Sequence, residues 1–183
     1  MVSLETPVCE FDKPAVDFQL PDTAGKLWSL ADCSGEKGLL VMFICNHCPY
    51  VKAIRERLVR DTAELKSLGI NSVAIMSNDP RQFEEDSLEN MRKISDEFNF
   101  SFPYLLDSTQ QVAKNYGAVC TPDFFGYNAE LKLQYRGRLD ASRKETAADA
   151  RRDLFEAMNT VAITGKGPKE QIPSMGCSIK WID

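Results

Sequence analysis

The sequence has 183 residues, of which 43% are hydrophobic and 27% are charged, and its formal net charge is −5 at pH 7. These values are typical of a globular protein, and the length predicts one domain over residues 1–183 that folds without a disulfide or a metal. The acidic balance argues against nucleic acids or anionic membranes as partners, and the longest apolar run, residues 39–45, is too short to span a membrane.

The first elements predicted along the chain are short strands. Residues 1–14 contain two prolines and little periodicity, and we expect an N-terminal arm there. Strands are predicted at 16–20 and 26–30, on either side of a turn-rich segment. A continuous apolar run at 39–44 indicates a third strand, which is buried on both faces.

Helices and strands alternate in the middle of the chain. Apolar residues recur at helical spacing from 49 to 68, and the next buried strand is predicted at 70–76. A charged helix is expected at 81–98, a short strand at 102–106 and a short helix at 108–116. This alternation indicates a sheet whose central strands are parallel.

The last third of the chain predicts a different arrangement. Strands at 124–127 and 131–135 are expected to form an antiparallel hairpin, and a last helix is predicted at 143–162. The tail, 164–183, is rich in glycine and proline, so we expect a loop. We therefore expect a mixed sheet, in which antiparallel strands at the edge join the parallel central strands.

Charged residues on the predicted helices form two groups. Arg55, Arg57 and Arg60 lie on the helix at 49–68, and the acidic run Glu84 to Asp86 lies on the helix at 81–98. Such groups are usually the solvated faces of helices. We therefore expect both groups to face solvent.

The cysteines and the histidine are the residues most informative about chemistry. The six cysteines are Cys9, Cys33, Cys45, Cys48, Cys120 and Cys177. They are spread over the whole chain, unlike those of a small disulfide-rich scaffold, and no signal peptide is visible, so we expect a cytoplasmic protein. The only histidine is His47, which excludes sites that need two histidines.

One segment carries a specific chemical signal. Residues 45–49 read Cys-Asn-His-Cys-Pro, at the junction between a predicted strand and a predicted helix. Two cysteines at this spacing can close a small disulfide loop, and a helix N-terminus stabilises a thiolate. A dipole effect of up to about 2 kcal/mol lowers a thiol pKa by roughly 1.5 units. A protonated His47 would act in the same direction.

The sequence leaves the roles of the two cysteines open. Pro49 suits the first turn of a helix and biases Cys48 away from helical dihedral angles, which makes Cys48 the N-cap residue. Dithiol oxidoreductases normally attack through the first cysteine, which favours Cys45. We favour Cys45 as the attacking residue and keep Cys48 as the alternative.

Other roles compete with redox chemistry for these cysteines. They could be buried structural residues, but their place at a strand-to-helix junction is typical of a redox pair. They could bind zinc together with Cys120 and Cys177, but those two do not form a second close pair. Covalent haem attachment is excluded because Pro49 follows the second cysteine. We therefore expect neither a metal nor a cofactor.

The chain resembles the thioredoxin-like superfamily. The closest likeness is to its peroxiredoxin-like branch of redoxin, or alkyl hydroperoxide reductase and thiol-specific antioxidant, domains with a CxxC dithiol. Besides the dithiol, the resemblance rests on residues 15–30, 119–125 and 176–181. It implies a thioredoxin-like α/β fold with a central mixed sheet flanked by helices, an N-terminal β-hairpin extension and a C-terminal tail.

The resemblance also implies roles for individual residues. The Thr121–Pro122 peptide is expected to be cis and to face the dithiol, where Thr121, Pro122 and His47 support the reaction. A histidine before the second cysteine is similar to that of DsbA-like oxidants and implies a more oxidising couple than thioredoxin. Cys120 and Cys177 are candidate resolving cysteines.

The sequence departs from the peroxiredoxin pattern at the peroxide site. Peroxiredoxins carry Thr or Ser three residues before the peroxidatic cysteine, where this chain has Cys45 before Cys48 and Met42 before Cys45. The arginine expected near residues 120–121 is not apparent either. The resemblance therefore favours disulfide exchange over efficient peroxide reduction.

We therefore expect a thiol–disulfide oxidoreductase that uses a Cys45/Cys48 couple. Its substrates are protein or small-molecule disulfides, and a thiol reductant such as the thioredoxin or glutathione system recycles it. One alternative is a thiol-dependent peroxidase with Cys48 as the peroxidatic cysteine, and another is a metal-binding or redox-sensing module. No residue pattern indicates the oligomeric state.

Overall fold

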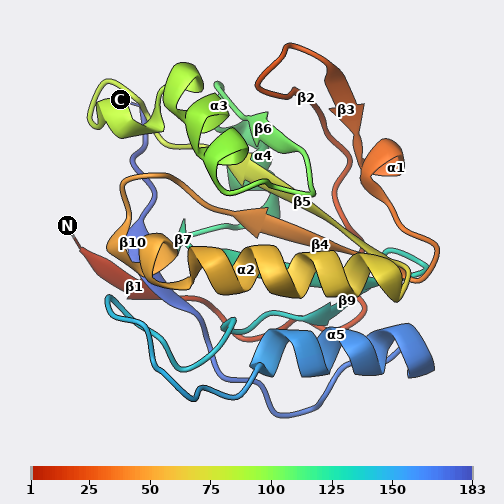
Figure 1. Ribbon diagram of the computed structural model, residues 1–183. Helices are drawn as coiled ribbons and strands as arrows, with labels where there is room; N and C mark the ends of the chain where they lie inside the picture. Colours follow the sequence, from red (N-terminus) through yellow and green to blue (C-terminus); the bar gives the residue numbers. More distant parts are fainter. Residues whose placement is uncertain (1, 183) are drawn as a thin grey trace.

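A mixed five-stranded sheet lies at the centre of the computed structural model, which describes residues 2–182 (Figure 1). The strand order is β6-β5-β4-β8-β9, with β4 (Gly38–Phe43) in the middle. β5 (Ile70–Met76) pairs parallel with β4 and with β6 (Tyr104–Leu106). On the other side, β8 (Asp123–Asn128) and β9 (Leu133–Tyr135) pair antiparallel. The predicted mixed sheet is confirmed.

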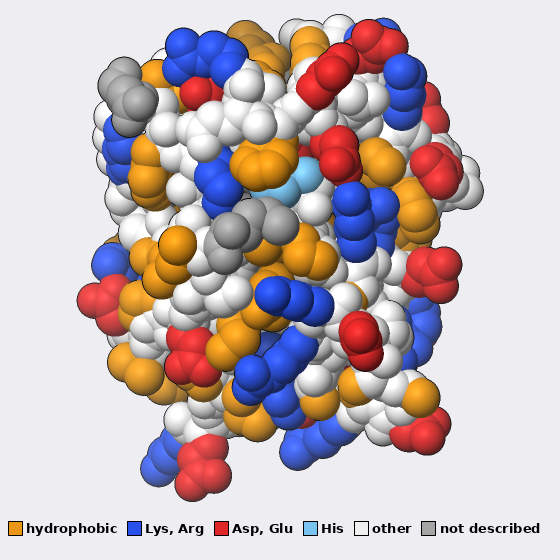
Figure 2. All heavy atoms as spheres, turned by 90° about the vertical axis from the view of Figure 1, so that its left-hand side faces the viewer, with side chains coloured by type: hydrophobic (Ala, Val, Ile, Leu, Met, Phe, Trp, Pro, Cys, Tyr) orange, Lys and Arg blue, Asp and Glu red, His pale blue; other side chains and the backbone are white. Residues whose placement is uncertain are grey.

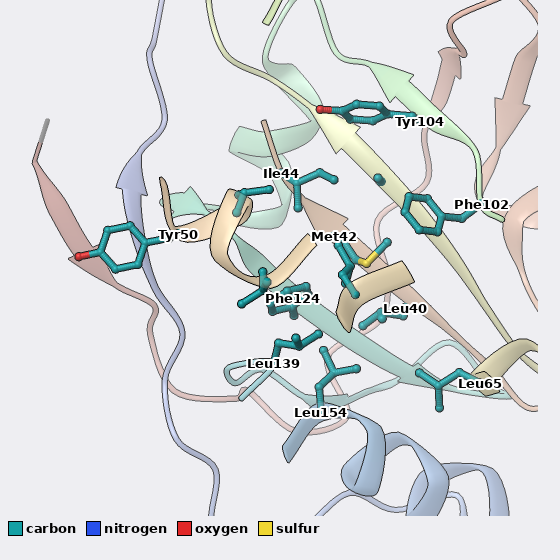
Figure 3. Close-up of a cluster of buried hydrophobic side chains, with 14 of the residues drawn as sticks. Leu40, Met42, Ile44, Tyr50, Leu65, Phe102, Tyr104, Phe124, Leu139 and Leu154 are labelled. Carbon is teal, nitrogen blue, oxygen red and sulfur yellow. The ribbon is translucent and has the colours of Figure 1, made fainter. Parts of the chain in front are cut away.

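One face of this sheet packs against three helices. They are α2 (Pro49–Ser67), α3 (Leu88–Glu97) and α5 (Asp153–Thr164), and all three contribute to one hydrophobic core. Figure 3 shows this core, to which β4 contributes Leu40 and Met42. Because side chains alternate along a strand, every second residue of β4 points here.

The other face of β4 builds a second core. Phe43 and the alternate residues before it pack against α1 (Leu30–Cys33) and α4 (Gln111–Tyr116). A hairpin of β2 (Gln19–Pro21) and β3 (Leu27–Ser29) covers the same side, as expected from the sequence. The central strand is therefore buried on both faces, which explains its unbroken apolar run.

The two ends of the chain form a second, three-stranded sheet. β10 (Met175–Ser178) lies between β1 (Ser3–Glu5) and β7 (Cys120–Thr121) and pairs antiparallel with both. Figure 1 shows this sheet at the end of the molecule where α2 begins. The predictions of an irregular arm at 1–14 and a loop at 164–183 were wrong for these strands, because their pairing is between segments remote in sequence.

Two predicted helices are shorter than the sequence suggested. The helix predicted at 81–98 is a 3₁₀ turn at Glu84–Asp86 followed by α3, and the helix predicted at 143–162 begins only at Asp153. Arg57 of α2 holds the segment before α5 in an irregular path. Its guanidinium donates to the Asp140 carboxylate at 2.7 Å and to the Ala148 carbonyl at 2.9 Å.

Among residues 2–182, no helix combines the length and the apolar character needed to cross a membrane.

Candidate active site

The two cysteines of the Cys-Asn-His-Cys motif lie between β4 and α2. Cys48 is the N-cap residue of α2, with extended dihedral angles (φ −67°, ψ 123°), and Pro49 occupies the first turn. Proline is favoured there because a first-turn N–H has no partner within the helix. The prediction that Cys48 caps the helix is confirmed. The sulfur therefore sits where the peptide dipoles of α2 concentrate positive potential.

Both thiols are closed off from solvent. Cys45 is 1% exposed and Cys48 is 0% exposed, and both are free cysteines. They belong to the hydrophobic core formed by α2, α3 and α5. A substrate can reach either sulfur only after a neighbouring segment moves.

The strand β7 brings Thr121 against both cysteines. The Thr121–Pro122 peptide is cis, as the resemblance implied. The Thr121 hydroxyl lies 3.2 Å from the Cys45 sulfur, and the Thr121 carbonyl oxygen lies 3.1 Å from the Cys48 sulfur, whose thiol form donates to it. One residue thus holds both sulfurs in place.

The negative charge of the reduced site is favoured on Cys48. The pKa of Cys48 is lowered to about 5, chiefly because the Cys45 thiol donates to its sulfur. Burial opposes this effect, while the Cys177 thiol and the backbone N–H of Val51 add further donors. The pKa of Cys45 is raised by burial, by its donation to Cys48 and by the Asp86 carboxylate. Cys45 therefore keeps its proton while Cys48 carries the charge.

A buried contact between His47 and Asp86 lies beside Cys45. The Nδ1 atom of His47 is 2.6 Å from the Asp86 carboxylate and 3.6 Å from the Cys45 sulfur. The carboxylate also accepts from the backbone N–H groups of Asn46 at 2.8 Å and of His47 at 3.2 Å, and from the Asn78 side chain at 3.0 Å. Burial would raise the pKa of Asp86, but these hydrogen bonds hold it below its ordinary value.

Asp86 corrects a sequence-based expectation. The acidic run Glu84 to Asp86 was expected to face solvent, yet Asp86 is 0% exposed and anchors the dithiol loop. The 3₁₀ turn points one carboxylate of the run inward, whereas a helix at 81–98 was predicted. The sequence does not distinguish Asp86 from Glu84 and Glu85, which are also acidic and are exposed, so its burial could not be predicted.

The two nitrogen atoms of the His47 ring differ in their hydrogen bonds. Its Nδ1 carries a proton, because a carboxylate can only accept a hydrogen bond. Its Nε2 is buried without a hydrogen-bond partner among residues 2–182. The ring stacks on Phe83, with 3.8 Å between the ring centres. Figure 2 shows part of the imidazole at the molecular surface.

The backbone between the cysteines is fixed by Asn46. Its side chain donates to the Glu85 carbonyl at 2.8 Å and accepts from the Tyr104 hydroxyl at 3.0 Å. The Arg55 guanidinium donates to the Asn46 carbonyl at 3.2 Å. Arg55 is 8% exposed, so the expectation that it faces solvent was wrong. Its spacing of four from the apolar Val51 was a signal that it shares the buried helix face.

The two candidate resolving cysteines are placed differently. The Cys177 sulfur lies 3.0 Å from the Cys48 sulfur, in the same hydrophobic core. The Cys120 thiol instead donates to the Pro122 carbonyl at 3.7 Å, and it lies outside that core. Side chains alternate along β7, so Thr121 faces the dithiol and Cys120 points away from it.

One group of side chains in the described part of the chain could hold a metal ion. The Cys45 sulfur, His47 Nδ1 and an Asp86 oxygen lie within 4.8 Å of one another. All three atoms already take part in the hydrogen bonds described above, so a metal would have to displace them. Over residues 2–182, the zinc set considered from the sequence, Cys45, Cys48, Cys120 and Cys177, is not gathered into such a group.

The fold and the site together define a thioredoxin-like protein of the redoxin type. The AhpC/TSA family model matches residues 11–139, so the chain belongs to the AhpC/TSA family. The expected thioredoxin-like fold and redoxin branch are confirmed. No curated protein matches the sequence significantly.

Solved structures share this fold. The chain is similar to an uncharacterized conserved protein from Geobacillus kaustophilus, with 41% identity, a TM-score of 0.93, and coverage of 100% of this chain and 97% of that one. A hypothetical protein from Sinorhizobium meliloti 1021 is 40% identical, with a TM-score of 0.92 and coverage of 97% and 98%. The thioredoxin domain of a thiol-disulfide oxidoreductase from Bacteroides vulgatus shares the fold at 20% identity, with a TM-score of 0.58 and coverage of 74% and 91%.

Family membership and the cluster of thiols support thiol redox chemistry as the general function.

Proposed function

We propose that the protein is a thiol–disulfide oxidoreductase whose redox couple is Cys45 and Cys48. The supporting observation is the place of the Cys48 sulfur, which caps the N-terminus of α2 and lies 3.0 Å from the Cys177 sulfur. These surroundings go with a pKa of Cys48 that is lowered to about 5, while Cys45 keeps its proton. A thiolate is the nucleophile in disulfide exchange, and a neighbouring thiol completes the exchange. This charge distribution favours Cys48 over Cys45 as the attacking residue.

The reaction proceeds in two exchanges. The Cys48 thiolate attacks one sulfur of a substrate disulfide, forms a mixed disulfide and releases a substrate thiolate, which takes up a proton. Cys45 then loses its proton and attacks the Cys48 sulfur, which releases the second substrate thiolate. Two electrons pass from the dithiol to the substrate, and a Cys45–Cys48 disulfide remains. A thiol reductant such as the thioredoxin or glutathione system reverses this change.

The His47–Asp86 pair assists the second exchange. Its Nδ1 is 3.6 Å from the Cys45 sulfur, so the N–H that points to Asp86 also lies beside the Cys45 thiolate as it forms. Before that step the Asp86 charge keeps Cys45 protonated. The pair therefore keeps Cys45 protonated until Cys48 has reacted with the substrate.

Substrate docking is assigned to the cavity beside the cis-proline. Tyr50, Pro122, Arg143 and Met175 are among the residues that line it. Tyr50 is two residues from Cys48, and Pro122 follows the threonine that contacts both sulfurs. A substrate chain bound there is next to the buried dithiol.

The test is trapping of the mixed disulfide in matched variants. Cys45→Ser/Cys177→Ala, which leaves Cys48 without a neighbouring thiol to displace the substrate, should accumulate a mixed disulfide on Cys48. Cys48→Ser should lose reduction of a protein disulfide at least 100-fold, and Cys120→Ser should retain the wild-type rate. Mass spectrometry of alkylated, unreduced protein identifies the bonded cysteine. Full activity in Cys48→Ser with loss in Cys45→Ser/Cys177→Ala would assign the attack to Cys45. Full activity in both variants would disprove the couple.

Peroxide reduction is the second candidate, because a low-pKa thiolate beside another thiol can also form a sulfenic acid and then a disulfide. Among the described residues, however, the groups that hydrogen-bond to the Cys48 sulfur are thiols, backbone N–H groups and the Thr121 carbonyl, and none of them is a hydroxyl or a guanidinium. We therefore expect hydrogen peroxide to oxidise the reduced protein at a rate near that of free cysteine. A rate many orders of magnitude higher would establish a peroxidase. Stoichiometric zinc in protein purified under reducing conditions would indicate a metal-binding module instead.

A further inference from the structure

A third thiol touches the sulfur that carries the charge. The Cys177 sulfur lies 3.0 Å from the Cys48 sulfur, although the two residues are 129 positions apart in the chain. Cys177 is 1% exposed and packs in the same core as Cys45 and Cys48. It lies outside residues 11–139, which are the part of the chain that the family model matches.

The small terminal sheet holds Cys177 in this position. Cys177 of β10 pairs directly with Thr121 of β7, so the two side chains project from the same face of the sheet. Thr121 contacts the cysteine pair from there, and Cys177 reaches Cys48 beside it. Gly176 permits the close pairing, since a Cβ there would lie 2.0 Å from the Thr121 carbonyl oxygen.

The third strand of the terminal sheet, β1, contacts α2, the helix that Cys48 caps. Ser3 of β1 pairs with Cys177, and its hydroxyl lies 3.0 Å from the Tyr50 hydroxyl of α2. The contact between Cys177 and Cys48 therefore belongs to an ordered sheet attached to the start of α2. It is not a contact made by an irregular tail.

We propose that Cys45, Cys48 and Cys177 form a three-thiol centre in which Cys48 can form a disulfide with either of the other two. This inference rests on the proposed function. In the exchange, the Cys177 thiol gives up its proton and its sulfur attacks the Cys48 sulfur of the Cys45–Cys48 disulfide. The new bond joins Cys48 to Cys177, the old bond breaks, and Cys45 leaves as a thiolate that takes up the proton. The protein neither gains nor loses electrons.

The same attack gives a second route for releasing substrate. When Cys48 carries a substrate in a mixed disulfide, Cys177 can displace the substrate thiolate as Cys45 does. The product is a Cys48–Cys177 disulfide, which covalently joins the start of α2 to β10. The two oxidising equivalents are then held in a bond between α2 and the terminal sheet.

Electrostatics supports this role once Cys48 has reacted. Burial and the neighbouring Cys48 raise the pKa of Cys177 to about 12, while Lys180 and Lys144 lower it. The contribution of Cys48 disappears when its sulfur enters a disulfide, because the thiolate charge is lost, but the lysines remain. Cys45 by contrast faces the Asp86 carboxylate, which disfavours its thiolate.

The test uses Cys45→Ser, which leaves Cys48 only one partner in the centre. The reduced variant is oxidised with excess oxidised glutathione, alkylated without reduction, and mapped by mass spectrometry. We expect most molecules to carry a peptide cross-linked between Cys48 and Cys177. Cys45→Ser/Cys177→Ala should instead stop with glutathione on Cys48, and Cys45→Ser/Cys120→Ser should cross-link like the single variant. Far-ultraviolet circular dichroism checks that each variant is folded.

Two results separate this inference from the proposed function. Glutathione on Cys48 with a free Cys177 in folded Cys45→Ser would overturn the three-thiol centre and leave the Cys45/Cys48 couple standing. The couple has its own readout, which is a Cys45–Cys48 disulfide in wild-type or Cys177→Ala protein oxidised in the same way. Absence of that disulfide in Cys177→Ala would overturn the couple itself.

Discussion

At the scale of single residues, the surroundings of each sulfur differ although the three thiols are in one cluster. The Cys48 sulfur sits at a helix N-terminus and receives hydrogen bonds, and so it carries the charge. Cys45 faces the Asp86 carboxylate and stays protonated. Cys177 is buried near Lys180. In the proposed mechanism, the attack therefore begins at Cys48, and Cys45 and Cys177 compete for the step that follows.

This difference predicts a titration result. The thiolate absorbance of the reduced protein should show one group with an apparent pKa near 5, and Cys45→Ala should raise that pKa, because the Cys45 thiol is the main donor to Cys48. Ultraviolet absorbance followed over a pH series measures both values. Cys120→Ala is the matched control and should leave the titration unchanged. An unchanged pKa in Cys45→Ala would show that the helix N-terminus alone holds the charge.

At the scale of elements, the segment between β5 and α3 closes over the dithiol loop. Its Asp86 binds two backbone N–H groups of the loop and the His47 ring, and its Phe83 stacks on that ring. Its Glu85 carbonyl accepts from the Asn46 side chain. This segment is therefore the one whose movement would uncover His47 and the sulfur next to it.

Asp86→Asn should destabilise the fold through this element. The variant replaces a buried carboxylate oxygen that accepts hydrogen bonds with an amide N–H group that faces the donors of His47 or Asn46. A loss of about 1–3 kcal/mol in the free energy of unfolding is expected. The control is Glu85→Gln, which removes an exposed ion pair with Lys52 and should change stability by less than about 0.5 kcal/mol. Denaturant unfolding measures both, and equal effects would contradict the anchoring role of Asp86.

At the scale of the whole molecule, the sequence predicted what depends on local pattern. The unbroken apolar run of β4 and the proline after Cys48 each carry their signal within a few residues, and the central sheet and the N-cap agree with them. The cis peptide before Pro122 was implied by the family resemblance and not by a local pattern. The strands β1 and β10 have little alternation of their own. They form because they pair with each other and with β7, and that pairing also sets the contact of Cys177 with Cys48.

The stability of the whole reduced protein should depend on pH through Cys48. The folded-state pKa of Cys48, about 5, is below the ordinary value of 9.0, so the thiolate stabilises the fold. This contribution is fully present above the unfolded-state pKa, declines by about 1.4 kcal/mol per pH unit below it, and is lost as the pH falls through 5. Cys45 does not contribute to the pH dependence of stability below pH 9, because its pKa is raised above 9.0 and it stays protonated there.

Comparison with Cys48→Ala isolates this contribution. Denaturant unfolding of the reduced proteins between pH 5 and 9 should give a difference in unfolding free energy that shrinks steadily as the pH is lowered, because only the wild type has the thiolate to lose. Packing lost in the variant adds a constant offset that does not change with pH. Stabilising the thiolate of the reduced protein in this way also makes the disulfide form more oxidising. A difference independent of pH would show that Cys48 titrates as an ordinary thiol and would remove the basis for its attack.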